Sequence, residues 1–310
     1  MAGLDRDGPL LSRRAALALG AGAVATAGGA VAGLLRNPDA AEVAGRGAAV
    51  EPQRGSFDFR PAGRKSIPAH YAIGAVEPAS AGVVIVMHGE DRNAADYRDA
   101  WVDLVRGRPL IAVAPQFGSS DFPGSREYNQ GGILDRDGDL RDAEAWAFGY
   151  IEPLFRQMRD RVGGGQTSFD LFGHSAGAQF VHRYVELMPA GSLRRAIAAN
   201  AGWYTMPDAG VPYPYGAGGA ARGLFDWPGA FRTELTVMVG DQDVLDANLR
   251  HDEGADAQGM TRWARGHAFL EQARDRAATL GVPIAWSLRE VAGVGHDYRQ
   301  MSAHAAALLG

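Results

Sequence analysis

Predicted strands and helices alternate along most of this 310-residue chain, and this alternation restricts the fold more than any other feature. Apolar runs rich in β-branched residues predict strands at 67–73, 83–87, 110–114, 168–172, 196–200, 235–239 and 284–291. Apolar residues at three- and four-residue spacing predict helices at 94–105, 143–161, 176–188, 263–280 and 297–309. Two of the runs, 83–87 and 235–239, are continuously apolar, as expected of parallel strands covered on both faces. We therefore predict a doubly wound, mostly parallel α/β sheet.

A candidate nucleophile follows one of the predicted strands. In sheets of this kind, ligands bind beyond the carboxyl ends of the strands. The sequence Gly173-His174-Ser175-Ala176-Gly177 lies at such an end, directly before a predicted helix. Glycine on both sides of Ser175 permits a sharp turn that exposes the hydroxyl at a helix N-terminus. The pattern is also compatible with a Gly-rich connection whose serine only caps the helix.

Two other strand ends carry the partners that a serine nucleophile needs. Asp241 and Asp243 follow the strand predicted at 235–239, and either carboxylate can orient an imidazole and balance its charge. His296 lies in a Gly-rich loop before the last predicted helix. The order Ser, Asp, His along the chain is the order found in many hydrolases. Alternatively, the aspartates form an acidic surface turn and His296 is a helix cap or a surface residue.

The segment Met87-His88-Gly89-Glu90 offers backbone N–H groups at a fourth strand end. We predict that the N–H of Glu90, with Gly89 as the alternative, joins that of Ala176 in an oxyanion hole. His88 is expected to be structural.

Together these four elements resemble the α/β-hydrolase superfamily over residues 56–309. Segments 88–93, 173–179 and 200–204 are similar to secreted bacterial esterases near the polyhydroxybutyrate depolymerases and feruloyl esterases. The resemblance implies an α/β-hydrolase fold in a single domain without a large lid. It also implies that Asp243 is the catalytic acid, and that Ser175, His296 and Asp243 cleave a carboxylic ester through an acyl-enzyme. No cofactor is expected.

The substrate is predicted only by class, as a small-molecule or oligomeric ester. Trp203 and Tyr204, in a loop rich in Gly, Pro and aromatic residues at 201–232, are candidate substrate-binding residues, although the aromatic residues could equally belong to the core. Alternative functions are an acyltransferase or a peptidase on the same triad, or a non-catalytic envelope protein that retains the fold.

Metal chemistry has little support in the sequence. The segment 135–139 alternates aspartates like a calcium loop, but Leu140 and Trp146 stand where that loop requires glycine and glutamate. The histidines lack the spacing of a metalloprotease. We predict no metal site.

The N-terminus predicts export. Ser12-Arg13-Arg14 precedes an uncharged apolar run at 15–35, which is typical of a twin-arginine signal, whereas the alternative is a membrane anchor. We predict a signal and tether over 1–50, with tether-like composition reaching residue 55, and a catalytic domain over 51–310. The expected partner is the twin-arginine translocation machinery, the expected location is the periplasm or the exterior, and no stable membrane anchor is expected.

A net charge of −5 without a basic segment argues against nucleic acid as a partner, and the absence of cysteine excludes disulfides and thiolate nucleophiles.

Overall fold

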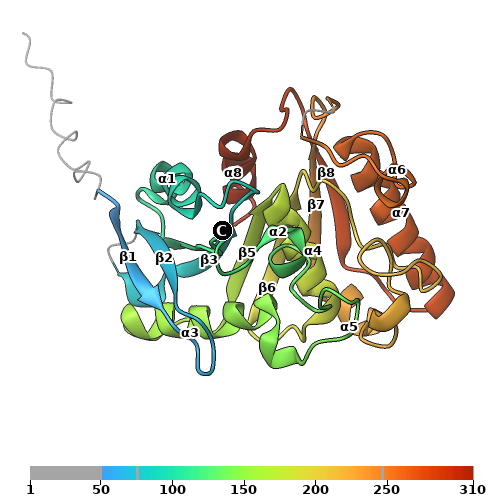
Figure 1. The fold of residues 1–310 in the computed structure, drawn as a ribbon. Coiled ribbons are helices and arrows are strands. Elements are labelled where there is room, and N and C mark those ends of the chain that lie inside the picture. The colour runs from blue at the N-terminus through green and yellow to red at the C-terminus, as the bar shows by residue number, and fades with distance from the viewer. Residues whose placement is uncertain (1–50, 75–76, 246–247, 310) are drawn as a thin grey trace, which may run out of the picture. The chain divides into compact units, whose positions relative to one another are not determined.

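The computed structural model describes residues 51–74, 77–245 and 248–309. Its centre is an eight-stranded sheet in the order β1-β2-β4-β3-β5-β6-β7-β8 (Figure 1). β1 and β2 pair antiparallel, as do β2 and β4, and all other neighbours are parallel. The predicted mostly parallel sheet is confirmed. The twin-arginine segment and the apolar run after it lie outside the described residues.

Every strand except β1 overlaps one of the predicted runs, and β1 was not predicted. Their bounds are β1 Gln53–Phe59, β2 Ile67–Ile73, β3 Gly82–Met87, β4 Leu110–Pro115, β5 Phe169–His174, β6 Leu193–Ala199, β7 Glu234–Gly240 and β8 Trp286–Val291. β1 has a largely polar sequence, and within it only Phe59 is fully buried, so hydrophobic patterning does not reveal this edge strand. Because β1 begins at Gln53, the last residues of the expected tether belong to the sheet.

The helices are α1 Ala94–Val105, α2 Gly124–Glu127, α3 Ile151–Arg161, α4 Ala176–Leu187, α5 Trp227–Arg232, α6 Glu253–Asp256, α7 Arg262–Leu280 and α8 Tyr298–Ala306. The helix predicted at 143–161 is wrong over its first half, which consists of two short 3₁₀ turns. Pro153 explains where α3 starts, because proline has no N–H to donate and is tolerated only in the first turn of a helix.

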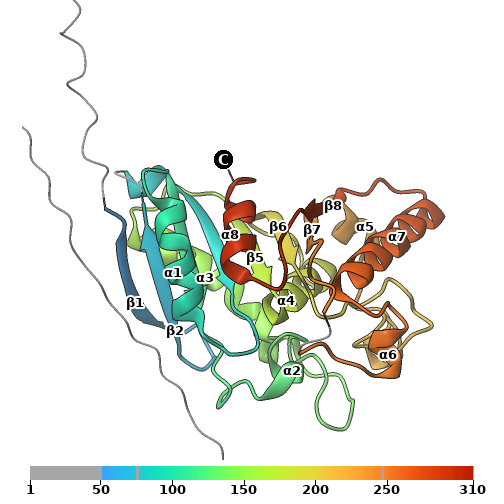
Figure 2. The ribbon, with the colours of Figure 1, turned by 90° about the horizontal axis from the view of Figure 1, so that it is seen from above.

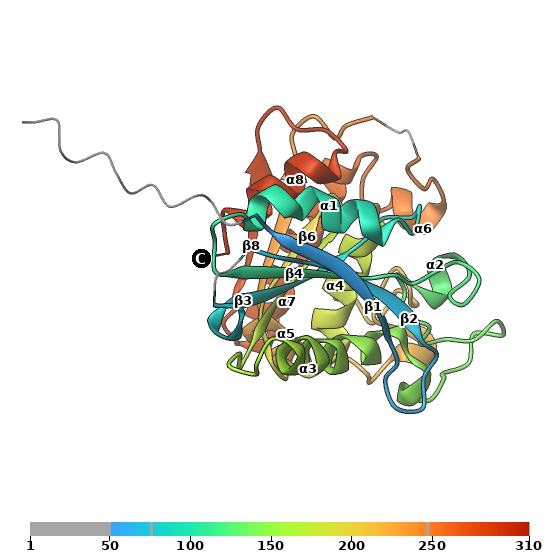
Figure 3. The same cartoon turned by 90° about the vertical axis from the view of Figure 1, so that its left-hand side faces the viewer.

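Helices cover both faces of the sheet. α1 and α8 contact each other on one face, while α4 and α7 pack against the other, and the three views agree (Figure 1, Figure 2 and Figure 3). β3 shows how the sequence serves this arrangement: Val83, Ile85 and Met87 join one core cluster, and Val84 and Val86 join the other. Since side chains alternate between the faces of a strand, a continuously apolar strand is buried on both.

β3, β5, β7 and β8 run parallel, so the loops that follow them leave the sheet at the same edge. We call this the carboxyl edge, and the opposite end of these strands the amino edge. Ser175, Asp243, His296 and Glu90 therefore all leave from the carboxyl edge. Within the residues that the structure describes, no helix is both long and apolar enough to span a membrane.

Candidate active site

Ser175 lies in a strained turn between β5 and α4. Its backbone angles are φ 57° and ψ −117°, a combination that residues other than glycine rarely adopt and that costs about 1–3 kcal/mol. The neighbouring glycines make this turn possible. A Cβ atom on Gly173 would lie 2.3 Å from the carbonyl oxygen of Gly177, and one on Gly177 would lie 2.2 Å from that of Met87. No larger residue fits either position without movement of the backbone.

The structure brings the three candidate triad side chains into one chain of hydrogen bonds. His296 Nε2 lies 3.0 Å from Ser175 Oγ, and His296 Nδ1 lies 2.7 Å from Asp243 Oδ2. A carboxylate only accepts hydrogen bonds, so in the neutral ring Nδ1 carries the proton and Nε2 is free to accept one from the serine. Asp243 is only 2% exposed, so the carboxylate side of this contact is shielded from water, whereas the His296 side chain is 31% exposed.

Asp241, the alternative acid, is bound elsewhere. Its Oδ1 accepts a hydrogen bond of 2.7 Å from the backbone N–H of Gly293, in the loop that carries His296. Asp241 therefore holds the histidine loop, and Asp243 contacts the imidazole. Local sequence left both aspartates open, and only the resemblance to the α/β-hydrolases favoured Asp243.

Arg262 anchors Asp243 from the other side. Its Nη1 donates to Asp243 Oδ1 at 3.2 Å, and both side chains are almost fully buried. Asp243 thus has one oxygen on an arginine and the other on the histidine, which fixes the carboxylate in place. Arg262 was not predicted, because nothing in the spacing of the sequence relates the first residue of α7 to the end of β7.

Asn200 connects the acid segment to the histidine loop and was also missed. Its Oδ1 accepts from the N–H of Gly240 at 2.8 Å, and its Nδ2 donates to the carbonyl of Gly295 at 3.0 Å. The residue is fully buried and has a positive φ of 50°. An asparagine directly after a buried strand was the available signal, because asparagine adopts this conformation more readily than most residues.

The candidate oxyanion segment is held by His88. The backbone N–H of Phe117 donates to His88 Nε2 at 3.0 Å, so Nδ1 carries the ring proton and donates to the carbonyl of Gly89 at 2.9 Å. Burial lowers the pKa of His88 to about 3, and this imidazole is neutral at ordinary pH. Its contact with Gly89 fixes the backbone directly before Glu90.

His174 packs beside the candidate catalytic histidine. Its ring centre lies 4.5 Å from that of His296, and its Nδ1 lies 3.2 Å from the hydroxyl of Tyr97. Burial, followed by the charges of His296 and Arg262, places the pKa of His174 well below its usual range. His174 is therefore a neutral wall beside His296 and does not compete with it for a proton.

Ser175 opens into a pocket of about 490 Å³ at the carboxyl edge. Its lining is mainly polar and includes Glu90 and Ala176, the two residues of the candidate oxyanion hole. Of the two aromatic residues expected to bind substrate, Trp203 lines this pocket. The structure does not bring Tyr204 there: its side chain is fully buried in the core and stacks on Phe269, with ring centres 4.5 Å apart.

The aspartate-rich turn at 135–139 is closed by its own backbone. Asp135 Oδ1 accepts hydrogen bonds of 2.9 Å from the N–H groups of Asp137 and Asp139. These bonds lower the pKa of Asp135. Among the described parts of the chain, no group of three or more histidine, aspartate and glutamate side chains is arranged to hold a metal ion.

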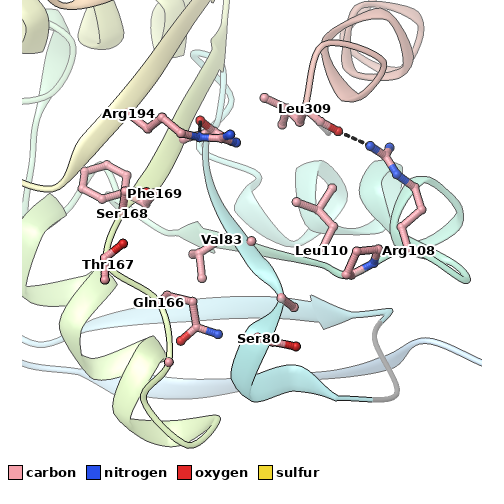
Figure 4. Close-up of a pocket in the computed structure, with 15 residues that line it drawn as sticks. Ser80, Val83, Arg108, Leu110, Gln166, Thr167, Ser168, Phe169, Arg194 and Leu309 are labelled. Carbon is pink, nitrogen blue, oxygen red and sulfur yellow. Dashed lines mark hydrogen bonds and ion pairs between the residues drawn. The ribbon is translucent and has the colours of Figure 1, made fainter.

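A second cavity, of about 450 Å³, lies at the amino edge (Figure 4). Asp170 and Arg194 form an ion pair there, and Arg108 donates to the carbonyl of Leu309. Asp170 is near the start of β5, whereas Ser175 follows its end. At about 3.3 Å per residue, this separates the cavity from the candidate triad by roughly 15–20 Å.

No family model matches the chain, and no curated protein does. Solved structures do. Poly(aspartic acid) hydrolase-1 from Sphingomonas sp. KT-1 is 38% identical, with a TM-score of 0.79, over 84% of this chain and 99% of that one. LpqC, a poly(3-hydroxybutyrate) depolymerase from Bordetella parapertussis, is 32% identical, with a TM-score of 0.78, over 83% of this chain and 89% of that one. An S-formylglutathione hydrolase from Agrobacterium tumefaciens, 18% identical over 85% of this chain and 95% of that one with a TM-score of 0.54, shares the fold.

Proposed function

Because this chain belongs to the α/β-hydrolase family, we propose that it is a serine hydrolase that cleaves a carboxylic ester through an acyl-enzyme. One observation carries this proposal: an unbroken chain of hydrogen bonds runs from Ser175 through His296 to Asp243. A serine whose hydroxyl touches an imidazole, with that imidazole oriented by a buried carboxylate, is the arrangement that activates serine for attack on a carbonyl.

Each side chain has a defined task in the reaction. His296 Nε2 takes the hydroxyl proton as Ser175 Oγ bonds to the acyl carbon, and the carbonyl oxygen becomes negatively charged. The charge returns to re-form the carbonyl, the bond to the alcohol breaks, and His296 gives its proton to the leaving oxygen. Water then attacks the acyl-enzyme by the same path and releases the acid. Asp243, held by Arg262, stabilises the imidazolium in both steps.

The backbone N–H groups of Ala176 and Glu90 are proposed to bind the oxyanion. Ala176 is the first residue of α4, so its N–H has no acceptor within the helix. Glu90 lines the same pocket, in a segment held by His88. Each such donor is worth roughly 10²–10³-fold in rate, because it is already in position when the charge develops.

A soluble, polar ester is the substrate class that fits this pocket. Its lining is dominated by arginine, serine, asparagine and glutamine side chains, with Trp203 and Leu249 as its main apolar members. Such a surface gains little from burying a long acyl chain. We also propose, from the likeness to a poly(3-hydroxybutyrate) depolymerase, that the chain is related to the secreted esterases of that branch and accepts oligomeric esters. Activity on 4-nitrophenyl esters should fall from short to long acyl chains.

A fluorophosphonate probe tests the mechanism. The wild-type chain should be labelled stoichiometrically at Ser175, and Ser175→Ala should lose the label. Ser119→Ala is the matched control, because this serine lines the same pocket and should leave labelling intact. Absence of labelling in folded protein would favour a non-catalytic binding protein. Faster cleavage of peptide amides than of 4-nitrophenyl esters would favour a peptidase.

Export by the twin-arginine route is a separate proposal that rests on Arg13 and Arg14. We propose a signal and tether over residues 1–50 and a periplasmic or extracellular catalytic domain. Arg13→Lys with Arg14→Lys should retain the protein in the cytoplasm. Normal export of this variant would refute the route without affecting the proposed chemistry.

A further inference from the structure

The pocket beside Ser175 is lined by arginines from three separate segments of the chain: Arg92, Arg250 and Arg262. The whole chain has a net charge of −5, so this concentration of positive charge is not a general property of its surface. What each guanidinium contacts decides whether its charge is available to a ligand.

The charge of Arg262 is taken up by its ion pair with Asp243. Arg262 donates to Asp243 Oδ1, and its side chain is only 3% exposed. Its charge balances a buried carboxylate, and we assign it no role toward the substrate.

Arg92 is held in place by neutral groups. Its Nη1 donates to the carbonyl of Phe117 at 2.7 Å, its Nη2 donates to that of Gly124 at 2.8 Å, and its guanidinium lies 4.3 Å from the ring centre of Tyr128. Within the described residues, no carboxylate lies within 4.0 Å of this guanidinium. Burial lowers its pKa, a sign that the charge is poorly solvated. Glu90 attracts this guanidinium only at longer range, and a fixed guanidinium without a directly bound carboxylate favours an anion.

Arg250 lies on the same pocket, on the side of Trp203. Its guanidinium is 5.4 Å from the centre of the Trp203 ring, and Nη1 donates to the hydroxyl of Tyr215 at 3.2 Å. Its acidic neighbour, Asp252, is 3.8 Å away and accepts a shorter bond of 2.5 Å from the Tyr215 hydroxyl. Both partners of this ion pair are more than 40% exposed, so the pair neutralises Arg250 weakly.

Glu90 is the acidic side chain that lines the pocket. It is exposed, so water screens its charge, whereas Arg92 is partly buried. Asp252 is exposed as well, so Arg92, which is partly buried and held by neutral groups, keeps the least screened charge of these four side chains.

We propose that this pocket recognises a carboxylate on the substrate, and that the preferred substrate is an ester that also carries a free carboxylate group, bound by Arg92 and Arg250. This inference rests on the proposed ester hydrolysis and adds selectivity for anionic esters to it. Guanidinium groups suit this task because they bind carboxylates through two parallel hydrogen bonds.

Two matched pairs of esters test the inference. The first is the 4-nitrophenyl half-ester of adipic acid against its methyl ester, which places the charge on the acyl side. The second is 4-carboxyphenyl acetate against its methyl ester, which places it on the leaving group. In at least one pair, kcat/KM should be about tenfold or more higher for the anion, the effect expected of one charge-assisted hydrogen bond. Raising NaCl from about 0.05 to about 0.5 M should reduce this preference.

Arg250→Gln should remove most of the preference, lowering kcat/KM for the anionic ester about tenfold more than it lowers kcat/KM for the neutral ester. Arg92→Gln should act in the same direction, but it also removes two bonds that hold the loop. Arg60→Gln is the matched control, because it makes the same change of charge at an exposed position just after β1 and should preserve the preference.

Failure of this inference differs from failure of the proposed function. If Ser175 is labelled and kcat/KM for each neutral ester equals that for its anionic partner, carboxylate recognition is refuted and the hydrolase stands. If no ester is cleaved and Ser175 is not labelled, the hydrolase fails. Carboxylate recognition is then decided by titrating adipate into the protein by calorimetry: binding that Arg250→Gln abolishes supports it, and absence of binding overturns it.

Discussion

The two edges of the sheet hold cavities of similar size, about 450 Å³ at the amino edge and about 490 Å³ at the carboxyl edge, and beside each lies a buried aspartate paired with an arginine. At the amino edge, Arg194 occupies both oxygens of Asp170. At the carboxyl edge, Arg262 occupies one oxygen of Asp243, and the other contacts His296. Neither a cavity nor an ion pair to a buried aspartate is enough to identify an active site. The feature that identifies the candidate active site is a titratable side chain, His296, that connects the carboxylate to a nucleophile.

The largest expected effect comes from removing the charge of each aspartate. Asp243→Asn should lower kcat/KM roughly ten-thousand-fold, because the amide no longer selects the correct tautomer of His296 or balances its charge. Asp170→Asn should leave kcat/KM of the folded protein unchanged and lower the free energy of unfolding by about 1–3 kcal/mol. Steady-state kinetics and denaturant titration measure the two effects.

Asp241→Asn is the control for the acid. An asparagine can still accept the bond from Gly293, so activity should change little. If Asp241→Asn is the damaging substitution and Asp243→Asn is harmless, the acid has been assigned to the wrong residue.

Replacing one glycine at each edge by alanine compares how tightly the two edges are packed. Gly177→Ala at the carboxyl edge places a Cβ atom 2.2 Å from the carbonyl oxygen of Met87, and it should cost about 3 kcal/mol of stability or displace Ser175. Gly82→Ala at the amino edge meets nothing closer than 3.8 Å and should be neutral or stabilising by about 0.5 kcal/mol. Equal thermal stability of the two variants would show that the turn at Ser175 is not tightly constrained.

Much of the carboxyl edge was predictable because strand ends are visible in the sequence. Apolar runs located β3, β5, β7 and β8, and the residues after them include every member of the hydrogen-bonded chain. Contacts between distant segments were not predictable. Arg262 and Asn200 reach the site only through the packing of α7 and β6 beside β7, and no local spacing encodes this. Nor did local pattern reveal that Tyr204 belongs to the core.

Acid should lower the stability of the folded chain, because three buried histidines near the carboxyl edge stay neutral there. Burial lowers the pKa of His88 to about 3 and holds those of His174 and His182 well below the usual value. The unfolded chain binds protons at these sites below about pH 6.5 and the folded chain does not, so stability falls as pH drops from about 6.5 toward 3. For His88 alone the loss at pH 5 is about 2 kcal/mol. Thermal unfolding measured from pH 8 to pH 4.5 checks the trend, and a melting temperature independent of pH would contradict it.

Asn200→Gly should lower activity much less than Asp243→Asn does. Glycine accepts the positive φ at this position but removes the bonds to Gly240 and Gly295. The histidine loop should then be held less firmly, and kcat/KM should fall by about tenfold, equivalent to about 1.4 kcal/mol. If activity is unchanged while stability falls, Asn200 supports the fold and does not position the triad.

An acyl group trapped on Ser175 would test the central claim most directly. Turnover of a 4-nitrophenyl ester, quenched with acid during the steady state and digested, should show by mass spectrometry one acyl group on the peptide that contains Ser175. Ser175→Ala should show neither the adduct nor turnover. Wild-type rates in Ser175→Ala, or an acyl group on a different residue, would contradict the proposal that this serine is the nucleophile.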